Sequence, residues 1–163
     1  MKKQMVYETI TSALRQRFDT ALWAAKQAHD AATNEESVAE NKYDTFGLEA
    51  SYLAHGQSQR VIDCENDWHT FEKKGCVLFE DSSTVALWAL VELSALEKNT
   101  FHTKWFFISP CAGGLTVEQS QQSVFLVTPS SPVGKVLIGK EEGDEVCLRQ
   151  NGLEVVYEIT RVC

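Results

Sequence analysis

Several common features are missing from this 163-residue sequence. No run of residues approaches the ~18 consecutive apolar side chains of a membrane-spanning helix, so no membrane partner is expected. The N-terminal lysines are followed by polar residues rather than by an apolar stretch, so no secretory signal is expected either. The five cysteines are odd in number and never form a Cys-x-x-Cys pair, which argues against a disulfide framework and against a structural zinc site. We therefore expect a cytoplasmic protein in a reducing environment.

Basic charge is also scarce. The formal net charge is −8, acidic residues outnumber basic ones in both halves of the chain, and neither half has a basic stripe. Direct binding to nucleic-acid phosphate depends on such a stripe, so no direct DNA binding is expected. Hydrophobic residues, in contrast, make up 44% of the chain and include four tryptophans. This is enough for a packed core and argues against global disorder.

Residues 1–75 contain two long segments with the three- and four-residue apolar spacing of a helix face. Along this face the side chains change from bulky to alanine in the first segment and from small to bulky in the second, so the two match only if the helices run antiparallel. We predict two helices of about 28 residues, a rod about 40 Å long, with Gly75 just past the end of the second. The face residues are Val6, Ile10, Leu14, Phe18, Ala21, Ala25, Ala28 and Ala32, followed by Ala50, Leu53, Gln57, Val61, Cys64, Trp68 and Phe71.

Between the two predicted helices lies an acidic segment, Thr33–Asp44, with a single cation, Lys42. Carboxylates at the bend of a helical hairpin lie far from any core, so packing does not explain them. We therefore expect the hairpin to be an arm that presents this acidic segment to another molecule. Its carboxylates are Glu35, Glu36, Glu40 and Asp44.

From Cys76 onward, short β-branched and aromatic runs separated by turn residues predict strands. Asn151-Gly152 is the strongest hairpin signal, and Pro132 with Gly139 predicts a short helix that has Pro at its first position and Gly past its end. The predicted fold class is α+β: residues 1–75 form an antiparallel helical hairpin (coiled coil), and residues 76–163 form a small antiparallel β-sheet domain with one short helix. The predicted strands are Val77–Phe79, Thr84–Leu93 (also compatible with a helix), Thr103–Ile108, Val124–Val127, Val146–Leu148 and Val155–Thr160.

Three stretches resemble parts of one family: Ser131–Val146, which begins Ser-Pro-Val-Gly, Glu154–Val162, and Ala39–Tyr43 in the acidic segment. The family is that of the Gre transcript-cleavage and elongation factors of bacterial RNA polymerase. The three stretches resemble the signature of its C-terminal domain, the last strand of that domain, and the start of its second arm helix. The order of parts also agrees, a helical hairpin followed by an FKBP-like domain. The resemblance covers most of the chain and is most specific from Ser131 onward.

This resemblance implies a partner and a way of acting on it. Gre factors insert their hairpin through the secondary channel of RNA polymerase, while the C-terminal domain binds at the channel rim. Carboxylates of the hairpin help to hold an Mg²⁺ ion of the polymerase active site, which suits the preference of Mg²⁺ for oxygen ligands and the use of two metals in such hydrolysis. The protein is then expected to contact RNA only inside the polymerase complex. The polymerase performs the cleavage, so the protein is not itself an enzyme and has no cofactor of its own.

The resemblance also implies roles for particular residues. Glu40 and Glu36 are the carboxylates expected at the catalytic Mg²⁺ of the polymerase. Ser37 stands where the family has an Asp, three residues before Glu40, and Glu36 lies one residue earlier, which is a rotation of about 100° on a helix. The residues expected to contact the polymerase are Asn41, Tyr43, Ser131, Pro132, Gly134, Gly139 and Lys140.

Other interpretations stay open. Ser37 favours a regulator that binds the secondary channel without stimulating cleavage. Glu40 and Glu36 are also compatible with solvated acids at the start of a helix, where the helix dipole favours them. An FKBP-type prolyl isomerase with a helical handle would require an apolar pocket in the β-sheet domain. A coiled-coil scaffold without a polymerase partner would leave the acidic segment unexplained.

Overall fold

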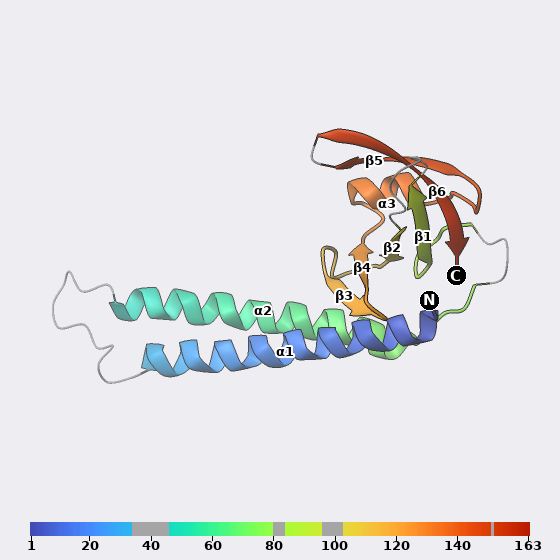
Figure 1. Cartoon of the computed structure of the whole chain (residues 1–163). Coiled ribbons are helices and arrows are strands. Elements are labelled where there is room, and N and C mark those ends of the chain that lie inside the picture. The colour runs from blue at the N-terminus through green and yellow to red at the C-terminus, as the bar shows by residue number, and fades with distance from the viewer. Residues whose placement is uncertain (34–45, 80–83, 96–102, 151) are drawn as a thin grey trace. The chain divides into compact units, whose positions relative to one another are not determined.

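The computed structural model describes residues 1–33, 46–79, 84–95, 103–150 and 152–163. The chain divides into two compact units: Thr11–Lys73 is a helical unit, and Met1–Ile10 joins Lys74–Cys163 in a β-rich unit. Figure 1 labels the elements of both. No helix within the described ranges is long and apolar enough to cross a membrane.

The helical unit is a hairpin made from α1 (Lys3–Thr33), whose first turns belong to the β-rich unit, and α2 (Phe46–Lys74). The two helices lie side by side (Figure 1), and the ring of Phe18 in α1 stacks on that of Trp68 in α2 with 5.7 Å between centroids. The guanidinium of Arg15 lies 4.3 Å from the centre of the same tryptophan ring. The predicted helical hairpin is confirmed.

Most of the predicted seam between the helices is also found. Ala21, Ala28 and Cys64 are buried along it, whereas Leu53 is 57% exposed. The prediction that Leu53 belongs to the buried seam is therefore wrong. Gly75 follows the end of α2 with φ of 69°, the left-handed conformation that a helix-ending glycine adopts.

The β-rich unit contains one six-stranded sheet and a short helix, α3 (Pro132–Leu137), which confirms the predicted fold class. The strand order across the sheet is β3-β4-β2-β1-β6-β5. Neighbouring strands are antiparallel except for β2 and β4. The strands are β1 (Leu90–Ala95), β2 (Thr103–Ile108), β3 (Thr116–Gln119), β4 (Gln122–Val127), β5 (Glu145–Gln150) and β6 (Leu153–Val162).

The parallel pair departs from the purely antiparallel sheet that the sequence predicts. After β2 the chain reverses into β3 and reverses again into β4. The second strand of this hairpin, rather than the first, lies beside β2, with Trp105 opposite Val124 and Ile108 opposite Val127. Two reversals restore the original direction, so β4 must run parallel to β2.

Two of the strand predictions are wrong: one strand begins later than predicted, and the other does not form. The strand expected at Thr84–Leu93 begins only at Leu90, because a turn precedes it. Trp88 in this turn has φ of 74°, and its N–H donates a hydrogen bond to the carbonyl of Ile108 at 2.7 Å. Val77–Phe79 forms no strand.

The turn of the β5–β6 hairpin can be predicted from the sequence, whereas the turn of the β3–β4 hairpin cannot. In the β5–β6 hairpin Gln150 pairs with Leu153, and Gly152 has φ of 85°, as the Asn-Gly signal predicts. The β3–β4 hairpin turns through Ser120 and Gln121, which have φ of 52° and 62°. Since neither is Gly or Asn, the sequence carries no turn signal there, and β3 was not predicted.

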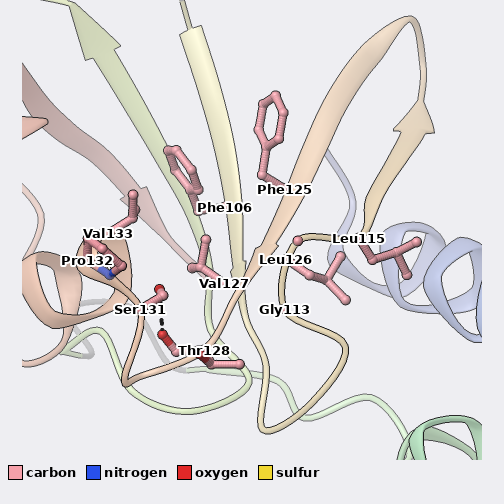
Figure 2. A pocket seen from close by; sticks show the side chains of 11 residues that line it. Phe106, Gly113, Leu115, Phe125, Leu126, Val127, Thr128, Ser131, Pro132 and Val133 are labelled. Atoms are coloured by element: carbon pink, nitrogen blue, oxygen red, sulfur yellow. Dashed lines mark hydrogen bonds between the residues drawn. The ribbon is translucent and has the colours of Figure 1, made fainter. Parts of the chain in front are cut away.

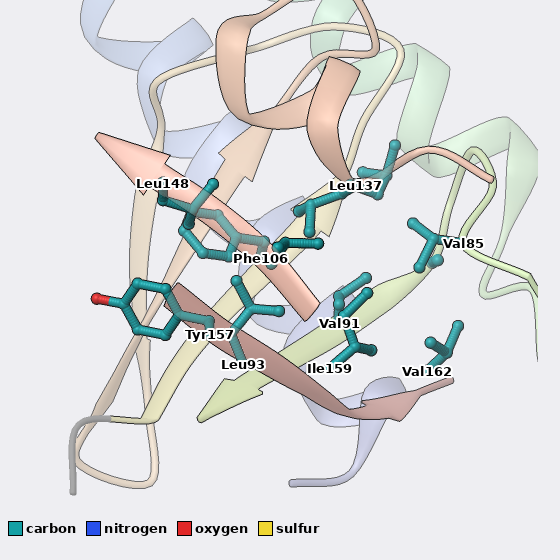
Figure 3. Packing of buried hydrophobic residues seen from close by; sticks show 12 residues of the cluster. Val85, Val91, Leu93, Phe106, Leu137, Leu148, Tyr157, Ile159 and Val162 are labelled. Atoms are coloured by element: carbon teal, nitrogen blue, oxygen red, sulfur yellow. The ribbon is translucent and has the colours of Figure 1, made fainter. Parts of the chain in front are cut away.

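One face of the sheet is covered by α3. Leu137 of this helix is fully buried against side chains of the central strands, among them Val91, Phe106 and Ile159 (Figure 3). Alternate residues on a strand point to opposite faces, so β1, β2 and β5 each give two residues spaced by two to this core. The other members of the cluster are Val85, Ala89, Leu93, Ile108, Val146, Leu148, Tyr157 and Val162.

The opposite face of the sheet packs against the first turns of α1. Tyr7 lies with its ring centroid 6.2 Å from that of Phe107 on β2 and 6.3 Å from that of Trp88. Next to this aromatic group, the hydroxyl of Thr9 donates a hydrogen bond to the side-chain oxygen of Gln119 on β3, at 2.7 Å. The sheet of the β-rich unit therefore has an apolar core on each face.

Candidate protein-binding groove

An apolar groove of about 630 Å³ opens between the start of α3 and the strands β2 and β4 (Figure 2). The rings of Phe106 on β2 and Phe125 on β4 lie next to each other along it, with 5.8 Å between centroids. Pro132 and Val133 contribute the α3 side. Concave, mainly apolar sites of this size are typical binding sites for ligands. The other lining residues are Gly113, Gly114, Leu115, Leu126, Val127, Thr128 and Ser131.

Ser131 fixes the α3 wall of the groove. It is the N-cap of α3, and its hydroxyl oxygen accepts a hydrogen bond from the N–H of Gly134 at 3.0 Å. The same hydroxyl donates to the carbonyl of Thr128 at 2.7 Å. Pro132 occupies the first helical position, where the missing N–H costs nothing. The Ser-Pro pair predicted from the sequence thus holds both residues at the edge of the groove.

Gly134 has a packing role beneath this wall. A Cβ atom at this position would lie 2.0 Å from the carbonyl oxygen of Thr128 and 3.1 Å from the Cα of Pro129. Both are backbone atoms, so no side-chain rotation could relieve the clash. The glycine lets α3 approach the end of β4 closely, and this approach positions Ser131 and Pro132.

Gly139 and Lys140 lie at the other end of α3 and do not line the groove. The N–H of Gly139, whose φ is 78°, donates to the carbonyl of Val85 at 2.8 Å, and the carbonyl of Lys140 accepts from the N–H of Val85 at 2.7 Å. Their main-chain atoms therefore anchor the segment that precedes β1. Contact of these two residues with a partner stays a prediction.

A second, smaller groove of about 180 Å³ adjoins the first and shares Phe106, Phe125 and Val133 with it. Its remaining lining residues include two cations, Lys104 and Arg149. An apolar surface with cations at its edge is suited to an apolar side chain of a partner that has a carboxylate nearby.

The sequence did not identify the two phenylalanines as groove residues. Phe106 lines both grooves and is also part of the buried core. Phe125 is 36% exposed, whereas Val124 and Leu126 on either side of it are buried. The sequence carries no signal for this, because Val124–Val127 is an uninterrupted apolar run; only the structure shows which of its residues point to which face of the sheet.

The acidic segment, apart from Thr33, lies outside the described residues. Glu36, Glu40, Asn41 and Tyr43 lie outside the described residues, so their expected roles stay predictions. Among the residues that the structure describes, no group of three or more His, Cys, Asp and Glu side chains could hold a metal ion.

Lys3 is an unexpected charged residue in the β-rich unit. It is only 5% exposed, and its Nζ has no hydrogen-bond partner among the described residues. The ammonium lies 4.0 Å from the centre of the Phe79 ring. Burial lowers the pKa of Lys3 to about 8, against the opposite effect of the nearby thiols of Cys76 and Cys163. Burial likewise raises the pKa of both thiols.

Comparison with solved structures finds chains that this protein resembles at low sequence identity. The structure of the transcription factor Gfh1 matches over 93% of this chain and 92% of its own, with 15% sequence identity and a TM-score of 0.41. The chain is similar to Gre-type transcription factors. GreA factor homolog 1 of Thermus thermophilus matches over 94% of both chains, with 19% identity and a TM-score of 0.40. The elongation factor GreA/GreB from Nitrosomonas europaea matches over 61% of this chain and 78% of its own, with 16% identity and a TM-score of 0.38.

No protein-family model matches the sequence. No curated protein matches it either. The likeness to Gre-type factors is thus one of structure, and it assigns no role to any residue of this chain. A function for this protein must therefore be argued from its sequence motifs and its groove.

Proposed function

We propose that this protein binds bacterial RNA polymerase at the secondary channel and modulates elongation or stimulates cleavage of backtracked RNA. The β-rich unit docks at the channel rim through its apolar groove. The hairpin carries the acidic segment toward the Mg²⁺ of the polymerase active site. RNA polymerase is the partner, and the cytoplasm is where the two meet.

One observation carries this proposal. The Ser131–Pro132–Val133 stretch, which begins the segment that resembles the Gre signature, forms one wall of the apolar groove. Ser131 caps α3, and Gly134 and Leu137 pack beneath it. The ring of Pro132 lies on the groove side, and this exposed part of a family signature is better explained by contact with a partner than by folding alone.

The hairpin suits the second part of the proposal. Its helices have 31 and 29 residues, which at 1.5 Å per residue is about 45 Å of helix. Such a hairpin is long enough to carry carboxylates from a docking surface into a deep channel. Glu40 and Glu36 supply the oxygen ligands that Mg²⁺ prefers. The ion belongs to the polymerase, which also performs the hydrolysis.

The alternative is a channel-binding regulator without cleavage activity. Ser37 favours it, because the family has a carboxylate at that position. Both functions require the same docking surface and differ only in what the acidic segment does.

Docking is tested by measuring the affinity of RNA polymerase for the protein and two variants. Phe125→Glu places a charge in the groove and is expected to weaken binding by about tenfold or more. Leu153→Glu is the matched control, because Leu153 is 71% exposed in the β5–β6 hairpin and lines neither groove. If both variants bind as the wild type does, the groove is not the docking surface. If the wild type does not bind at all, both functions are excluded.

Cleavage is tested on a backtracked elongation complex that carries labelled RNA. Short 3′ fragments with the wild type, but not with Glu40→Ala or with a variant in which Glu35 and Glu36 are both alanine, support stimulation of cleavage. Tight binding without fragments supports the regulator instead. A prolyl isomerase would require an apolar pocket in the β-rich unit, and the groove is such a pocket. Isomerisation of an X–Pro peptide faster than the uncatalysed rate would favour this third function.

A further inference from the structure

The outward face of α2 carries a line of exposed residues, which we call the α2 stripe. Leu48, Tyr52 and Ile62 in this line are 58%, 70% and 50% exposed. Side chains turn by about 100° per residue along a helix, so Ile62 points about 200° away from Cys64 on the buried seam. The stripe therefore faces away from α1. Its members are Leu48, Tyr52, His55, Gln59 and Ile62.

The spacing of the α2 stripe is that of a coiled-coil seam. Its residues follow one another at steps of four, three, four and three, as core residues of a heptad repeat do. The line runs from Leu48 to Ile62, about 21 Å of helix, unlike the single exposed apolar residues of an ordinary surface. Polar residues in the middle of such a seam set its register, and His55 and Gln59 are placed to do so. A stripe of this kind fits a helix laid alongside α2.

Small residues flank the α2 stripe. Gly56 adjoins it, and a Cβ atom at this position would have no neighbour within 4 Å. A glycine inside an exposed helix costs about 1 kcal/mol relative to alanine, and nothing in the described fold requires it. Ser51 and Ser58 occupy the other flank. Small residues allow the backbone of a second helix to come close.

The charges that flank the stripe are negative. Glu49, Asp63 and Glu65 occupy positions next to the seam, where residues of a coiled coil pair with charges on the partner. Asp63 accepts a hydrogen bond from the amide of Gln59 at 3.1 Å, which keeps its carboxylate beside the stripe. A second copy of this chain would bring acidic flanks against acidic flanks, and this repulsion disfavours self-association.

We propose that the α2 stripe docks an amphipathic helix of another protein, one whose apolar face is flanked by lysine or arginine. Contact along the stripe buries apolar surface of both helices, and Gly56 lets the partner helix approach α2 closely. The acidic flanks select the partner by charge. This inference concerns a different surface from the groove. It holds or fails independently of the proposed polymerase docking.

The test uses the full chain and two designed helical peptides of about four heptads, long enough to be helical. Both have apolar core positions; one has lysine and the other glutamate at every flanking position. Fluorescence anisotropy at ~0.1 M salt measures their affinities. The lysine peptide is expected to bind about tenfold or more tightly than the glutamate peptide. Equal affinities, or no binding of either peptide, would overturn the proposal.

Variants locate the interaction on α2. Tyr52→Glu should weaken binding of the lysine peptide by about tenfold or more, while Trp23→Glu should not. Trp23 is the matched control because it is an exposed aromatic residue, 65% exposed, on α1. Ser58→Glu should tighten binding and Ser58→Lys should weaken it. Circular dichroism of each variant checks that the helices persist.

Two results would reject this location or this partner. Loss of binding in Trp23→Glu, or identical behaviour of the two Ser58 variants, would mean that the stripe does not select the peptide. Sedimentation equilibrium that shows a wild-type dimer, dissociated by Tyr52→Glu, would assign the stripe to a second copy instead.

Discussion

Replacing Lys3 by methionine should stabilise this protein. The ammonium of Lys3 is buried in the β-rich unit, and within the part of the chain that the structure describes no hydrogen-bond acceptor reaches its Nζ. The ring of Phe79, 4.0 Å away, gives partial compensation, worth about 0.5 to 1 kcal/mol. Methionine has a similar length, fills the same space and carries no charge to desolvate.

The expected gain follows from the lowered pKa of Lys3. Burial lowers this pKa from 10.5 to about 8, and each pKa unit corresponds to about 1.4 kcal/mol. The buried charge thus costs the native state about 3 kcal/mol below pH 8, and about 2 kcal/mol once screening by solvent is allowed for. After the lost contact with Phe79 is subtracted, Lys3→Met should raise the free energy of unfolding near pH 7 by about 1 kcal/mol or slightly more.

The sign of the pH dependence provides the sharper test. Below pH 8 the amine is charged in both the folded and the unfolded chain, so the native state bears the whole penalty. Between pH 8 and 10.5 the folded chain releases this proton while the unfolded chain keeps it, so the penalty disappears as the pH rises. The advantage of Lys3→Met should therefore be largest near pH 7 and vanish near pH 10.5. The charge of Lys3 also acts on the pKa of the Cys76 and Cys163 thiols, against the larger effect of burial, so a double Cys76→Ala and Cys163→Ala background removes this coupling from the comparison.

Urea unfolding followed by circular dichroism, at pH values from about 7 to about 10.5, measures this difference. Lys2→Met is the matched control, because Lys2 is exposed and its replacement should change stability by less than about 0.5 kcal/mol at any of these pH values. A Lys3→Met variant that is less stable than the wild type near pH 7, or whose advantage does not change with pH, would refute the reasoning.

Three further predictions concern glycine and serine positions, each checked by urea unfolding. Gly134→Ala should destabilise the protein by about 3 kcal/mol, because the new Cβ would overlap the Thr128 carbonyl and the backbone must shift; no loss would mean that α3 does not approach β4 as described. Ser131→Ala should cost about 1 kcal/mol through loss of the N-cap, and an unchanged midpoint would contradict that role. Gly56→Ala should instead raise the free energy of unfolding by about 1 kcal/mol, since the added methyl meets open space. It should also weaken binding of the lysine peptide. A loss of stability would show that Gly56 has a packing role within the protein.

Local patterns were sufficient for much of the fold. The two helices, their antiparallel hairpin and the short helix after Ser131 follow from apolar spacing and from Pro and Gly at helix ends. The β5–β6 hairpin follows from Asn-Gly. For the groove, the Ser-Pro pair was found from the sequence, since a capping serine before a proline is a local signal. The roles of Glu40 and Glu36 stay predictions, because they lie outside the described residues.

The elements whose conformation depends on neighbouring residues, and the overall α+β class, could therefore be predicted from the amino-acid sequence. Three features could not be predicted in this way: β4 lies parallel to β2, Phe106, Phe125 and Pro132 meet in one groove, and Lys3 is buried. These features depend on which distant segments come together. Hydrophobic burial is non-directional, so the same apolar side chains could pack in other arrangements, and no pattern within a single segment selects among them.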